Sequence, residues 1–352
     1  MNLQQHNISD NNFEQCIKCT ICTVYCPVAA VNPNYPGPKQ AGPDGERLRL
    51  KKFNFYDESL KYCIACPSNV KIGDIIQAAR IKYSKKQPKL RDYILANTDL
   101  VGTLSTPFAP IVNTTLGLKP VKAILDGVMK IDHRRTFPKY AFGTFESWYK
   151  KVAEKQAAYP SQVSYFHGCY VNYNNPQLGK DLIKVMNAFS IGVQLLEKEK
   201  CCGVALISNG LIKQAQKQAR TNINSIRKSV LEKNIPVIAT SSTCTFTIRD
   251  EYPHLLDIDN ADVREDVELA TRYIYRLLSQ KKTKLNFKTG QKIKVAYHTP
   301  CHMEKLGWAY YSIECASSHP ISKSLQKACG VELDRSRVTN IEERGGRGVV
   351  AA

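Results

Sequence analysis

The distribution of apolar residues divides the chain into a helical first part and a second part in which short strands alternate with helices. After Pro160, short apolar runs alternate with longer stretches of helical periodicity. These patterns predict strands over Val163–Phe166, Val193–Leu196 and Pro236–Thr240, and helices over Asp181–Phe189 and Leu211–Lys233. Because strands that alternate with helices usually pair in parallel, we expect an α/β domain here.

The first part contains one clear amphipathic helix and one apolar segment that prolines interrupt. Four apolar residues within Val70–Tyr83 lie at helical spacing, which predicts a helix, whereas the Pro- and Gly-rich stretch Asn32–Asp44 is typical of a linker. The segment Leu100–Ile131 is rich in Leu, Val, Ile and Phe and is bordered by basic residues. It fits an amphipathic helix that covers the core and equally one that lies in a membrane interface.

Four cysteines near the start of the chain follow the spacing CxxCxxCxxxCP. They are Cys16, Cys19, Cys22 and Cys26, and Pro27 follows the last. In bacterial ferredoxins, three cysteines of such a loop bind one iron–sulfur cluster and the fourth binds another. A structural zinc site instead uses paired CxxC units separated by a loop, so the spacing favours an iron–sulfur cluster.

A second cysteine group, Cys63-Ile-Ala-Cys66-Pro67, provides the fourth ligand of that cluster. By the ferredoxin pattern, Cys66 joins Cys16, Cys19 and Cys22 in one 4Fe-4S cluster. A second ferredoxin-type cluster would have only Cys26 and Cys63 of its four ligands. We therefore expect the second ferredoxin-type site to be empty or unstable.

Another four cysteines lie at the ends of predicted strands. Cys169, the adjacent pair Cys201-Cys202 and Cys244 are in positions where open α/β sheets place ligands, and Gly203 follows the pair. Adjacent cysteines can bind neighbouring metal atoms when a glycine lets the backbone turn closely around a cofactor. The alternative is a set of buried free cysteines, which are common in proteins.

The motif that ends at Cys169 recurs near the end of the chain. Val163–Cys169 and Val295–Cys301 both place a cysteine just past a short apolar strand, which indicates that one α/β module is used twice. We expect the neighbouring histidines to form hydrogen bonds rather than to bind metal; these are His167, His298 and His302. Cys315 and Cys329 are expected to be free thiols.

Composition limits the classes of partner. The chain has 352 residues, 13 cysteines and a formal net charge of +19. The polar stretch Met1–Asn12 lacks the apolar core of a signal peptide, and no apolar run is long enough to span a bilayer, so we expect a cytoplasmic, peripheral protein. The basic residues are spread along the chain without a nucleic-acid-binding motif. An anionic membrane surface or an acidic protein therefore fits the charge better than nucleic acid.

These motifs together resemble the iron–sulfur, CCG-domain family of the C subunit of anaerobic glycerol-3-phosphate dehydrogenase. The motifs are CxxCxxCxxxCP from Cys16, Cys66-Pro-Ser-Asn-Val-Lys-Ile-Gly-Asp-Ile-Ile, Phe166-His-Gly-Cys169, Cys201-Cys-Gly203 and Tyr297-His-Thr-Pro-Cys-His302. The CCG unit also resembles heterodisulfide-reductase-type proteins. The resemblance implies an α+β multidomain protein: a helical, bacterial ferredoxin-like iron–sulfur domain (1–87), a linker with an amphipathic, membrane-associated segment (88–160), an α/β CCG domain (161–285), a truncated second CCG domain (286–330) and a disordered basic tail (331–352).

The resemblance implies an electron-transfer protein rather than an enzyme with chemistry of its own. Such a protein passes electrons from a flavoprotein catalytic dimer towards membrane quinone and anchors the dimer at the cytoplasmic face of the inner membrane. The implied metal ligands are Cys16, Cys19, Cys22, Cys26, Cys63 and Cys66, and an additional cluster would use Cys169, Cys201, Cys202, Cys244 and Cys301. No GxGxxG fingerprint follows a predicted strand, so flavin belongs on another chain.

The chain departs from the family pattern at two places, which leaves two other functions open. Two cysteines are missing between Cys63 and Cys66, and several dozen residues are missing after Glu314. One alternative is an enzyme of the heterodisulfide-reductase type that acts on thiols or disulfides. The other is a degenerate copy that no longer assembles its clusters.

Overall fold

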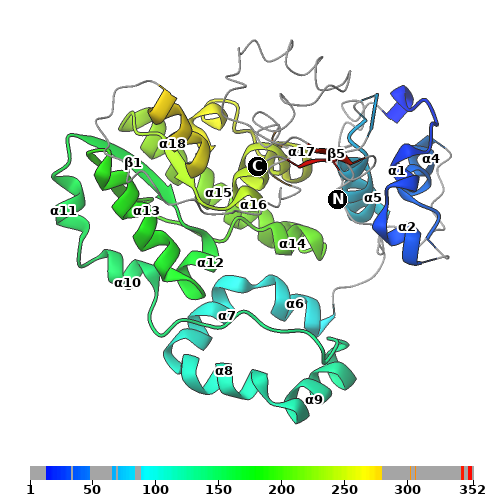
Figure 1. Cartoon of the computed structure of the whole chain (residues 1–352), viewed down its shortest axis with the longest axis horizontal. Helices are drawn as coiled ribbons and strands as arrows, with labels where there is room; N and C mark the ends of the chain where they lie inside the picture. Colours follow the sequence, from blue (N-terminus) through cyan, green and yellow to red (C-terminus); the bar gives the residue numbers. More distant parts are fainter. Residues whose placement is uncertain are drawn as a thin grey trace. The chain divides into compact units, whose positions relative to one another are not determined.

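The computed structural model describes residues 13–32, 35–47, 66–68, 70–83, 89–279, 302, 306, 342–344 and 348–350. They belong to two compact units (Figure 1). The N-terminal unit contains residues 1–84 and 287–352, and the central unit contains residues 85–286. Each unit is described by itself below.

The N-terminal unit consists mainly of short helices around a small apolar cluster. Its elements are the 3-10 turn Phe13–Gln15 and the helices α1 (Ile21–Val24), α2 (Pro27–Val31), α3 (Pro38–Ala41), α4 (Pro43–Arg47) and α5 (Ile72–Tyr83). The predicted amphipathic helix is confirmed as α5. Its residues Ile72, Ile75 and Ile76 are buried and pack against Tyr35 and Ala41. Each such buried side chain contributes about 1.5–3 kcal/mol relative to an exposed one.

Two stretches of this unit differ from the predictions. The segment Asn32–Asp44, predicted to be a linker, contains α3 and the start of α4. The reason is that Pro38 occupies the first turn of α3, where its fixed φ favours a helix. Within the predicted disordered tail, β5 (Glu342–Arg344) and β6 (Gly348–Val350) pair antiparallel. The sequence between them contains Gly-Gly, a pair that favours tight hairpin turns.

A four-stranded parallel sheet lies at the centre of the central unit. The strands are β1 (Ser161–Phe166), β2 (Ile191–Leu195), β3 (Val237–Ala239) and β4 (Val267–Leu269), and their order is β2-β1-β3-β4. Ser161 of β1 pairs with Ile191 of β2, and Ser164 pairs with Val237 of β3. The predicted parallel sheet and its first three strands are confirmed. β4 was not predicted, because Glu268 interrupts its apolar residues and leaves no apolar run.

Helices cover this sheet and connect its strands. They are α12 (Gly168–Tyr173), α13 (Pro176–Ala188), α14 (Val204–Ser208), α15 (Ile212–Arg227), α16 (Ser242–Phe246), α17 (Tyr252–Leu256) and α18 (Ala270–Ser279). α13 begins five residues before the predicted helix, because Asn175 caps it and Pro176 occupies its first turn. The predicted helix Leu211–Lys233 is α15, extended by a π-helical turn over Lys228–Glu232. The turns Thr247–Glu251 (π-helical) and Arg264–Asp266 (3-10) complete these connections.

The segment before the sheet, predicted to be a linker with an amphipathic part, is helical and belongs to the same unit. Its helices are α6 (Leu90–Ala96), α7 (Thr98–Ser105), α8 (Ala109–Gly117), α9 (Lys119–Met129), α10 (Phe145–Tyr149) and α11 (Ala153–Ala157), with a 3-10 turn at Thr106–Phe108. Phe145 and Tyr149 of α10 are buried in the apolar cluster that also contains Val163 and Tyr165 of β1. The structure therefore joins the end of the predicted linker to the core of the sheet.

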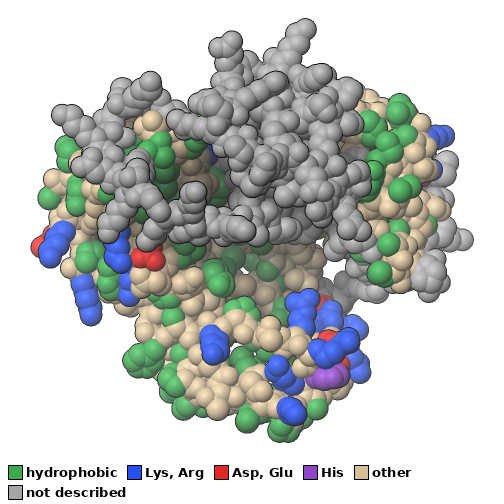
Figure 2. All heavy atoms as spheres, viewed as in Figure 1, with side chains coloured by type: hydrophobic (Ala, Val, Ile, Leu, Met, Phe, Trp, Pro, Cys, Tyr) green, Lys and Arg blue, Asp and Glu red, His purple; other side chains and the backbone are tan. Residues whose placement is uncertain are grey.

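Helices α6 to α9 carry many exposed apolar side chains. The side chains of Leu104, Phe108 and Ile111 are 64%, 61% and 66% exposed. Basic side chains border the apolar ones on the lobe that α7 to α9 form (Figure 2). Among the described residues, no helix has both the length and the hydropathy that crossing a bilayer requires.

Candidate metal centres

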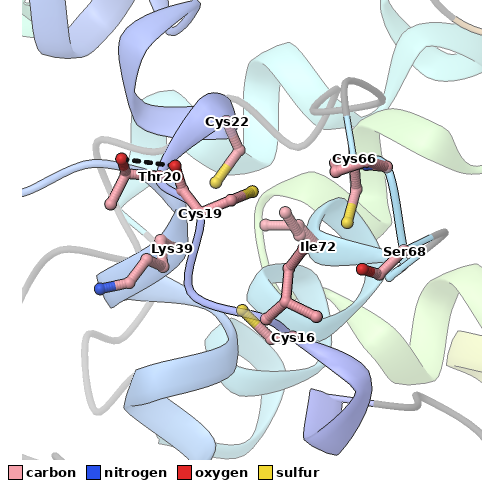
Figure 3. A pocket seen from close by; sticks show the side chains of 10 residues that line it. Cys16, Cys19, Thr20, Cys22, Lys39, Cys66, Ser68 and Ile72 are labelled. Carbon is pink, nitrogen blue, oxygen red and sulfur yellow. Dashed lines mark hydrogen bonds between the residues drawn. The ribbon is translucent and has the colours of Figure 1, made fainter.

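Four of the predicted metal ligands line one pocket of the N-terminal unit. Cys16 and Cys19 come from the loop that leads into α1, Cys22 lies in the first turn of α1, and Cys66 comes from the segment before α5 (Figure 3). Lys18, between Cys16 and Cys19, and Thr20, directly after Cys19, have left-handed backbone conformations, with φ of 58° and 63° respectively. Such residues curl the loop tightly, so that cysteines three apart face the same pocket.

The pocket has donors suited to an iron–sulfur cluster. The backbone N–H of Val70 donates a hydrogen bond to the Cys66 sulfur over 3.3 Å, and hydrogen bonds to sulfur are one means by which proteins set cluster potentials. Burial raises the pKa of the Cys22 thiol. Among the described residues, no three His, Cys, Asp or Glu side chains converge closely enough to hold a single metal ion. The four thiols surround the pocket instead, and a four-iron cube needs ligands spread around it in this way.

The remaining ferredoxin-type cysteines are not part of the pocket. Cys26 caps the start of α2 and is 3% exposed, packed in the apolar cluster with Tyr35 and Ala41. Cys63 lies outside the described residues. Whether either residue binds iron stays a prediction.

The central unit holds a second group of thiols. Cys169 lies in the first turn of α12 after β1, Cys201 and Cys202 lie between β2 and α14, and Cys244 lies in α16 after β3. The sulfur atoms of Cys169 and Cys201 are 3.6 Å apart. All four residues thus follow the carboxyl ends of parallel strands, where the sheet brings distant parts of the chain together.

Two glycines allow the thiols to approach one another. Gly168 has φ of 69°, and a Cβ atom at this position would lie 3.2 Å from the Cys244 sulfur. Gly203 has φ of 86° and turns the chain directly after the cysteine pair into α14. Both positions therefore favour glycine. At Gly203 the reason is the positive φ, and at Gly168 it is the positive φ together with the lack of room for a Cβ atom beside Cys244.

The thiols of this second centre interact electrostatically. Contact with Cys169 and Cys202 lowers the pKa of Cys201, whereas contact with Cys201 raises the pKa of Cys169 and of Cys202. Of these three thiols, Cys201 is thus the one that most readily carries a thiolate, the form that binds metal. The donor set, soft thiols in a buried site, fits an iron–sulfur cluster.

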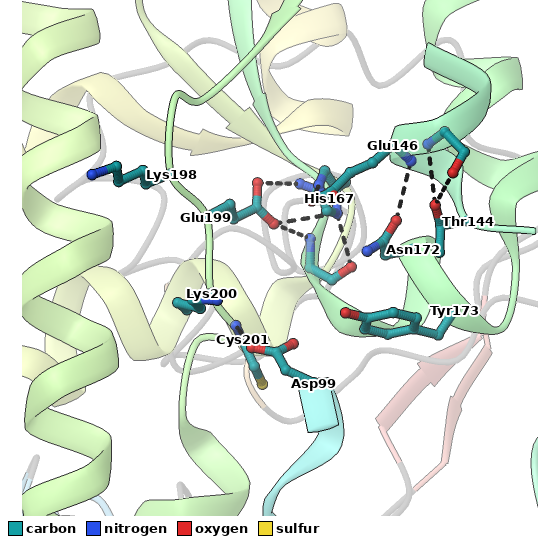
Figure 4. A network of polar contacts seen from close by, with 12 residues as sticks. Asp99, Thr144, Glu146, His167, Asn172, Tyr173, Lys198, Glu199, Lys200 and Cys201 are labelled. Atoms are coloured by element: carbon teal, nitrogen blue, oxygen red, sulfur yellow. Dashed lines mark hydrogen bonds and ion pairs between the residues drawn. The ribbon is translucent and has the colours of Figure 1, made fainter. Parts of the chain in front are cut away.

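A buried carboxylate lies beside this centre and holds the backbone before Cys169. Glu199 accepts hydrogen bonds from the N–H groups of His167 and Gly168, over 3.3 Å and 2.7 Å (Figure 4). Burial raises the pKa of Glu199 to about 7. Burial alone would lower the pKa of His167, but the carboxylates of Glu199 and Glu146 raise it to about 9. As predicted from the sequence, His167 thus forms hydrogen bonds: its Nδ1 lies 3.0 Å from the Gly168 carbonyl oxygen.

Asp99 of α7 is a site residue that the sequence did not reveal. Its Oδ2 accepts a hydrogen bond from the N–H of Cys201 over 2.8 Å, and burial raises its pKa (Figure 4). No cysteine lies near Asp99 in the sequence, so no local pattern could have pointed to it. Of the other predicted candidates, Cys301 and His298 lie outside the described residues, and His302 is buried.

Comparisons with known proteins match the second group of cysteines to a family model and the chain as a whole to a known subunit. Residues 163–249 match the family model described as a cysteine-rich domain, and all four thiols of the second centre lie within this range. The chain is 62% identical over 320 residues to the C subunit of anaerobic glycerol-3-phosphate dehydrogenase from Escherichia coli K12, covering 89% of this chain and 80% of that protein. The chain belongs to the family of this dehydrogenase's C subunit.

More distant relatives of the chain include subunits of two reductases. The chain is 23% identical to the D subunit of dihydromethanophenazine:CoB–CoM heterodisulfide reductase from Methanosarcina barkeri, over 90% of this chain and 77% of that protein. It is 26% identical to the B subunit of fumarate reductase (CoM/CoB) from Methanothermobacter marburgensis, over 41% of this chain and 26% of that protein. No solved structure matches the chain.

Proposed function

We propose that this chain is the iron–sulfur electron-transfer subunit of an anaerobic glycerol-3-phosphate dehydrogenase. It receives electrons from flavoprotein catalytic subunits and passes them towards membrane quinone. The observation that carries the proposal is the presence of two separate thiol groups, one in each unit, in a chain of this dehydrogenase family.

The first group, Cys16, Cys19, Cys22 and Cys66, would hold one 4Fe-4S cluster. A bound cluster supplies one-electron transfer, and the protein supplies the ligands and the surrounding dipoles. The hydrogen bond from the Val70 N–H to the Cys66 sulfur is one such dipole. The curled loop fixes the other three thiols before the cluster binds, which limits the rearrangement that binding requires.

The second group, Cys169, Cys201, Cys202 and Cys244, would hold an additional iron–sulfur cluster. Because both units carry thiols, electrons can enter at one cluster and leave at the other. The test is to mix the chain anaerobically with flavoprotein catalytic subunits of this dehydrogenase and glycerol 3-phosphate. The visible absorption of the oxidised clusters should bleach only when all three are present, and bleaching without the flavoprotein would contradict the proposed relay.

We also infer that helices α6 to α9 dock on the anionic, cytoplasmic face of the inner membrane. Leu104, Phe108 and Ile111 expose apolar side chains, and the lobe carries basic residues at its border (Figure 2). Burial of apolar side chains in the membrane interface and attraction of lysine or arginine to anionic lipid both favour membrane binding. Each basic residue near the membrane surface contributes about 1 kcal/mol to the binding free energy.

Vesicle flotation tests the membrane role. The unaltered chain should float with vesicles that contain anionic lipid, and the paired substitutions Leu104→Asp and Ile111→Asp should abolish flotation. Leu231→Asp is the matched control, because Leu231 is also a large exposed residue, at 57%, but lies on the π-helical turn after α15. If the control and the paired variant float equally, α6 to α9 are not the docking surface.

A second function is thiol or disulfide chemistry at the second centre, as in heterodisulfide-reductase-type enzymes. The observation in its favour is the 3.6 Å separation of the Cys169 and Cys201 sulfur atoms, which places two thiols side by side. In this case, a low-molecular-weight disulfide added to the reduced chain should reoxidise it and be converted to two thiols without any partner. Under the electron-transfer proposal, the disulfide alone has no effect on the rate of reoxidation.

A further inference from the structure

The adjacent cysteines of the second centre lie on backbone that has no regular secondary structure. Between the end of β2 and the start of α14, residues 196–203 form neither helix nor strand. Cys201 and Cys202 are 5% and 2% exposed, so their backbone polar groups have little access to water. Each such group needs a partner within the protein, because leaving one unpaired costs about 1–3 kcal/mol.

One face of α15 supplies several of these partners. Ser225 accepts a hydrogen bond from the N–H of Lys198 and donates one to the carbonyl oxygen of the same residue. Asn222, one turn earlier on the same face, accepts from the N–H of Lys200 over 2.8 Å and donates from Nδ2 to the Cys201 carbonyl oxygen over 3.3 Å. The segment before the cysteine pair is therefore held along α15.

Tyr252, at the start of α17, supplies the partner of the second cysteine. Its hydroxyl donates a hydrogen bond to the Cys202 carbonyl oxygen over 2.9 Å and accepts one from Nδ2 of Asn222 over 3.0 Å. Asn222 and Tyr252 are both completely buried. The two side chains thus form one connected pair that contacts the carbonyl groups of both cysteines.

The direction of these carbonyl groups decides where the two thiols point. Residues 196–203 form neither helix nor strand, so no repeating backbone conformation sets the direction of the two thiols; it depends on how the peptides around the pair are held. Asp99 holds the N–H of Cys201 and the Asn222–Tyr252 pair holds the carbonyls of Cys201 and Cys202. One side-chain hydrogen bond therefore holds each of three consecutive peptides, those before, between and after the two cysteines.

We propose that Asn222 and Tyr252 are positioning residues that orient the Cys201 and Cys202 thiols for cluster binding. Neither side chain contacts the cluster through a ligand bond; they act through the backbone of the two cysteines. The proposal deepens the proposed function and rests on it for the presence of a cluster, but the orientation of the thiols can be tested with or without iron.

The variants are Tyr252→Phe, which removes only the hydroxyl, and Asn222→Ala. Matched controls are available for both. Tyr149 is a buried tyrosine whose hydroxyl donates to the Val193 carbonyl oxygen over 2.7 Å, and Asn260 is a buried asparagine whose Nδ2 donates to two backbone carbonyls, those of Ile248 and Arg249. Tyr149→Phe and Asn260→Ala therefore remove buried hydrogen bonds to backbone carbonyls away from the cysteine pair.

The first measurement uses the full chain with Cys22→Ser, so that the spectrum reports the second centre. Tyr252→Phe should shift the g values and midpoint potential of that centre, whereas Tyr149→Phe should leave both unchanged. Asn222→Ala should lower the iron bound there, and Asn222→Gln, which keeps the amide, should restore part of it. Equal spectra for Tyr252→Phe and Tyr149→Phe would overturn the proposal.

The second measurement uses the cluster-free full chain and follows alkylation of each cysteine by mass spectrometry, with buried Cys26 as the internal reference. Tyr252→Phe should speed labelling of Cys202 about fivefold to tenfold, the factor that one buried hydrogen bond contributes to a local opening equilibrium. Equal labelling in Tyr149→Phe would overturn the proposal. If the unaltered chain binds no iron at the second centre, the proposed cluster fails, while this labelling ratio still decides the positioning claim.

Discussion

The sulfur atoms of Cys169 and Cys201 lie 3.6 Å apart, although 32 positions separate the two residues in the chain. They meet because β1 and β2 are neighbouring parallel strands, with Tyr165 of β1 paired to Leu195 of β2. Each cysteine follows the carboxyl end of its strand. The same topology brings Cys244 to this edge after β3, so the sheet itself assembles the second centre.

This proximity predicts a disulfide in the cluster-free chain. Two thiols in contact exchange readily with oxidised glutathione, forming a Cys169–Cys201 bond and releasing two molecules of reduced glutathione. Mass spectrometry after alkylation should show this bond in the unaltered chain and its absence in Cys169→Ser. Cys26→Ser is the control and should not change it. A mixture of random pairings would show that the contact does not direct the chemistry.

Substitution of Gly168 should disturb the second centre through Cys244. Gly168→Ala places a methyl group 3.2 Å from the Cys244 sulfur and also strains a backbone with φ of 69°. Gly210→Ala is the matched control, because Gly210 has φ of 74° but open space around its Cβ position. Both variants should lose similar stability, and only Gly168→Ala should lose iron at the second centre. Equal iron in the two variants would contradict the crowding argument.

Phe145 should be one of the most important core residues of the central unit. It is completely buried, and its ring packs edge-on against Tyr165 with 5.7 Å between ring centroids. Phe145→Ala should lower the free energy of unfolding of the cluster-free chain by about 3–5 kcal/mol, measured by urea denaturation. Phe142→Ala should change it little, because Phe142 is 80% exposed. A small effect at Phe145 would mean that α10 does not belong to the core.

The ion pair between Arg249 and Glu265 predicts a dependence of stability on pH. Arg249 is buried, and its hydrogen bonds to the Glu265 carboxylate lower the pKa of that group below its usual 4.5. A depressed pKa stabilises the fold above the unfolded-state value, and this contribution is lost as the pH falls through the folded-state value. Glu265→Gln should therefore cost about 1 kcal/mol or less at pH 7, since Glu265 is largely exposed.

The same cost should vanish when the pH is well below the folded-state pKa of Glu265. Urea denaturation of the cluster-free chain at neutral and at strongly acidic pH measures the difference, with the exposed Glu154→Gln of α11 as the control. A cost for Glu265→Gln that does not fall with pH would show that the side chain acts through packing rather than charge.

The sequence predicted those parts of the fold whose pattern is local. The apolar runs before Cys169 and Cys244 identified β1 and β3, and the helical spacing of Ile72, Ile75 and Ile76 identified α5. β4 was missed, because Glu268 lies in the middle of its three residues and no apolar run marks the strand. The segment Asn32–Asp44 was interpreted as a linker because it is rich in proline and glycine. Proline is common both in linkers and in the first turn of a helix, and sequence alone does not separate these two uses.

For the candidate sites, the sequence identified the thiols but not the residues that hold them. Cysteine spacing is a strong local signal, and the four cysteines that it singled out line one pocket of the structure; their binding of a cluster stays a prediction. Asp99, Asn222 and Tyr252 are ordinary residue types that lie 20 or more positions from the cysteines they contact. Only the folded topology brings them there, so no spacing could reveal them.

The central claim is that the chain carries two iron–sulfur clusters, one in each unit. The most direct test is to express the full chain anaerobically and to measure iron and acid-labile sulfide per chain, with EPR of the reduced protein, in the unaltered chain and in Cys22→Ser and Cys202→Ser. The account predicts appreciably more than about four irons in the unaltered chain, with each variant losing a different EPR signal. About four irons that only Cys22→Ser removes would contradict the second cluster, and no iron at all would identify a degenerate copy.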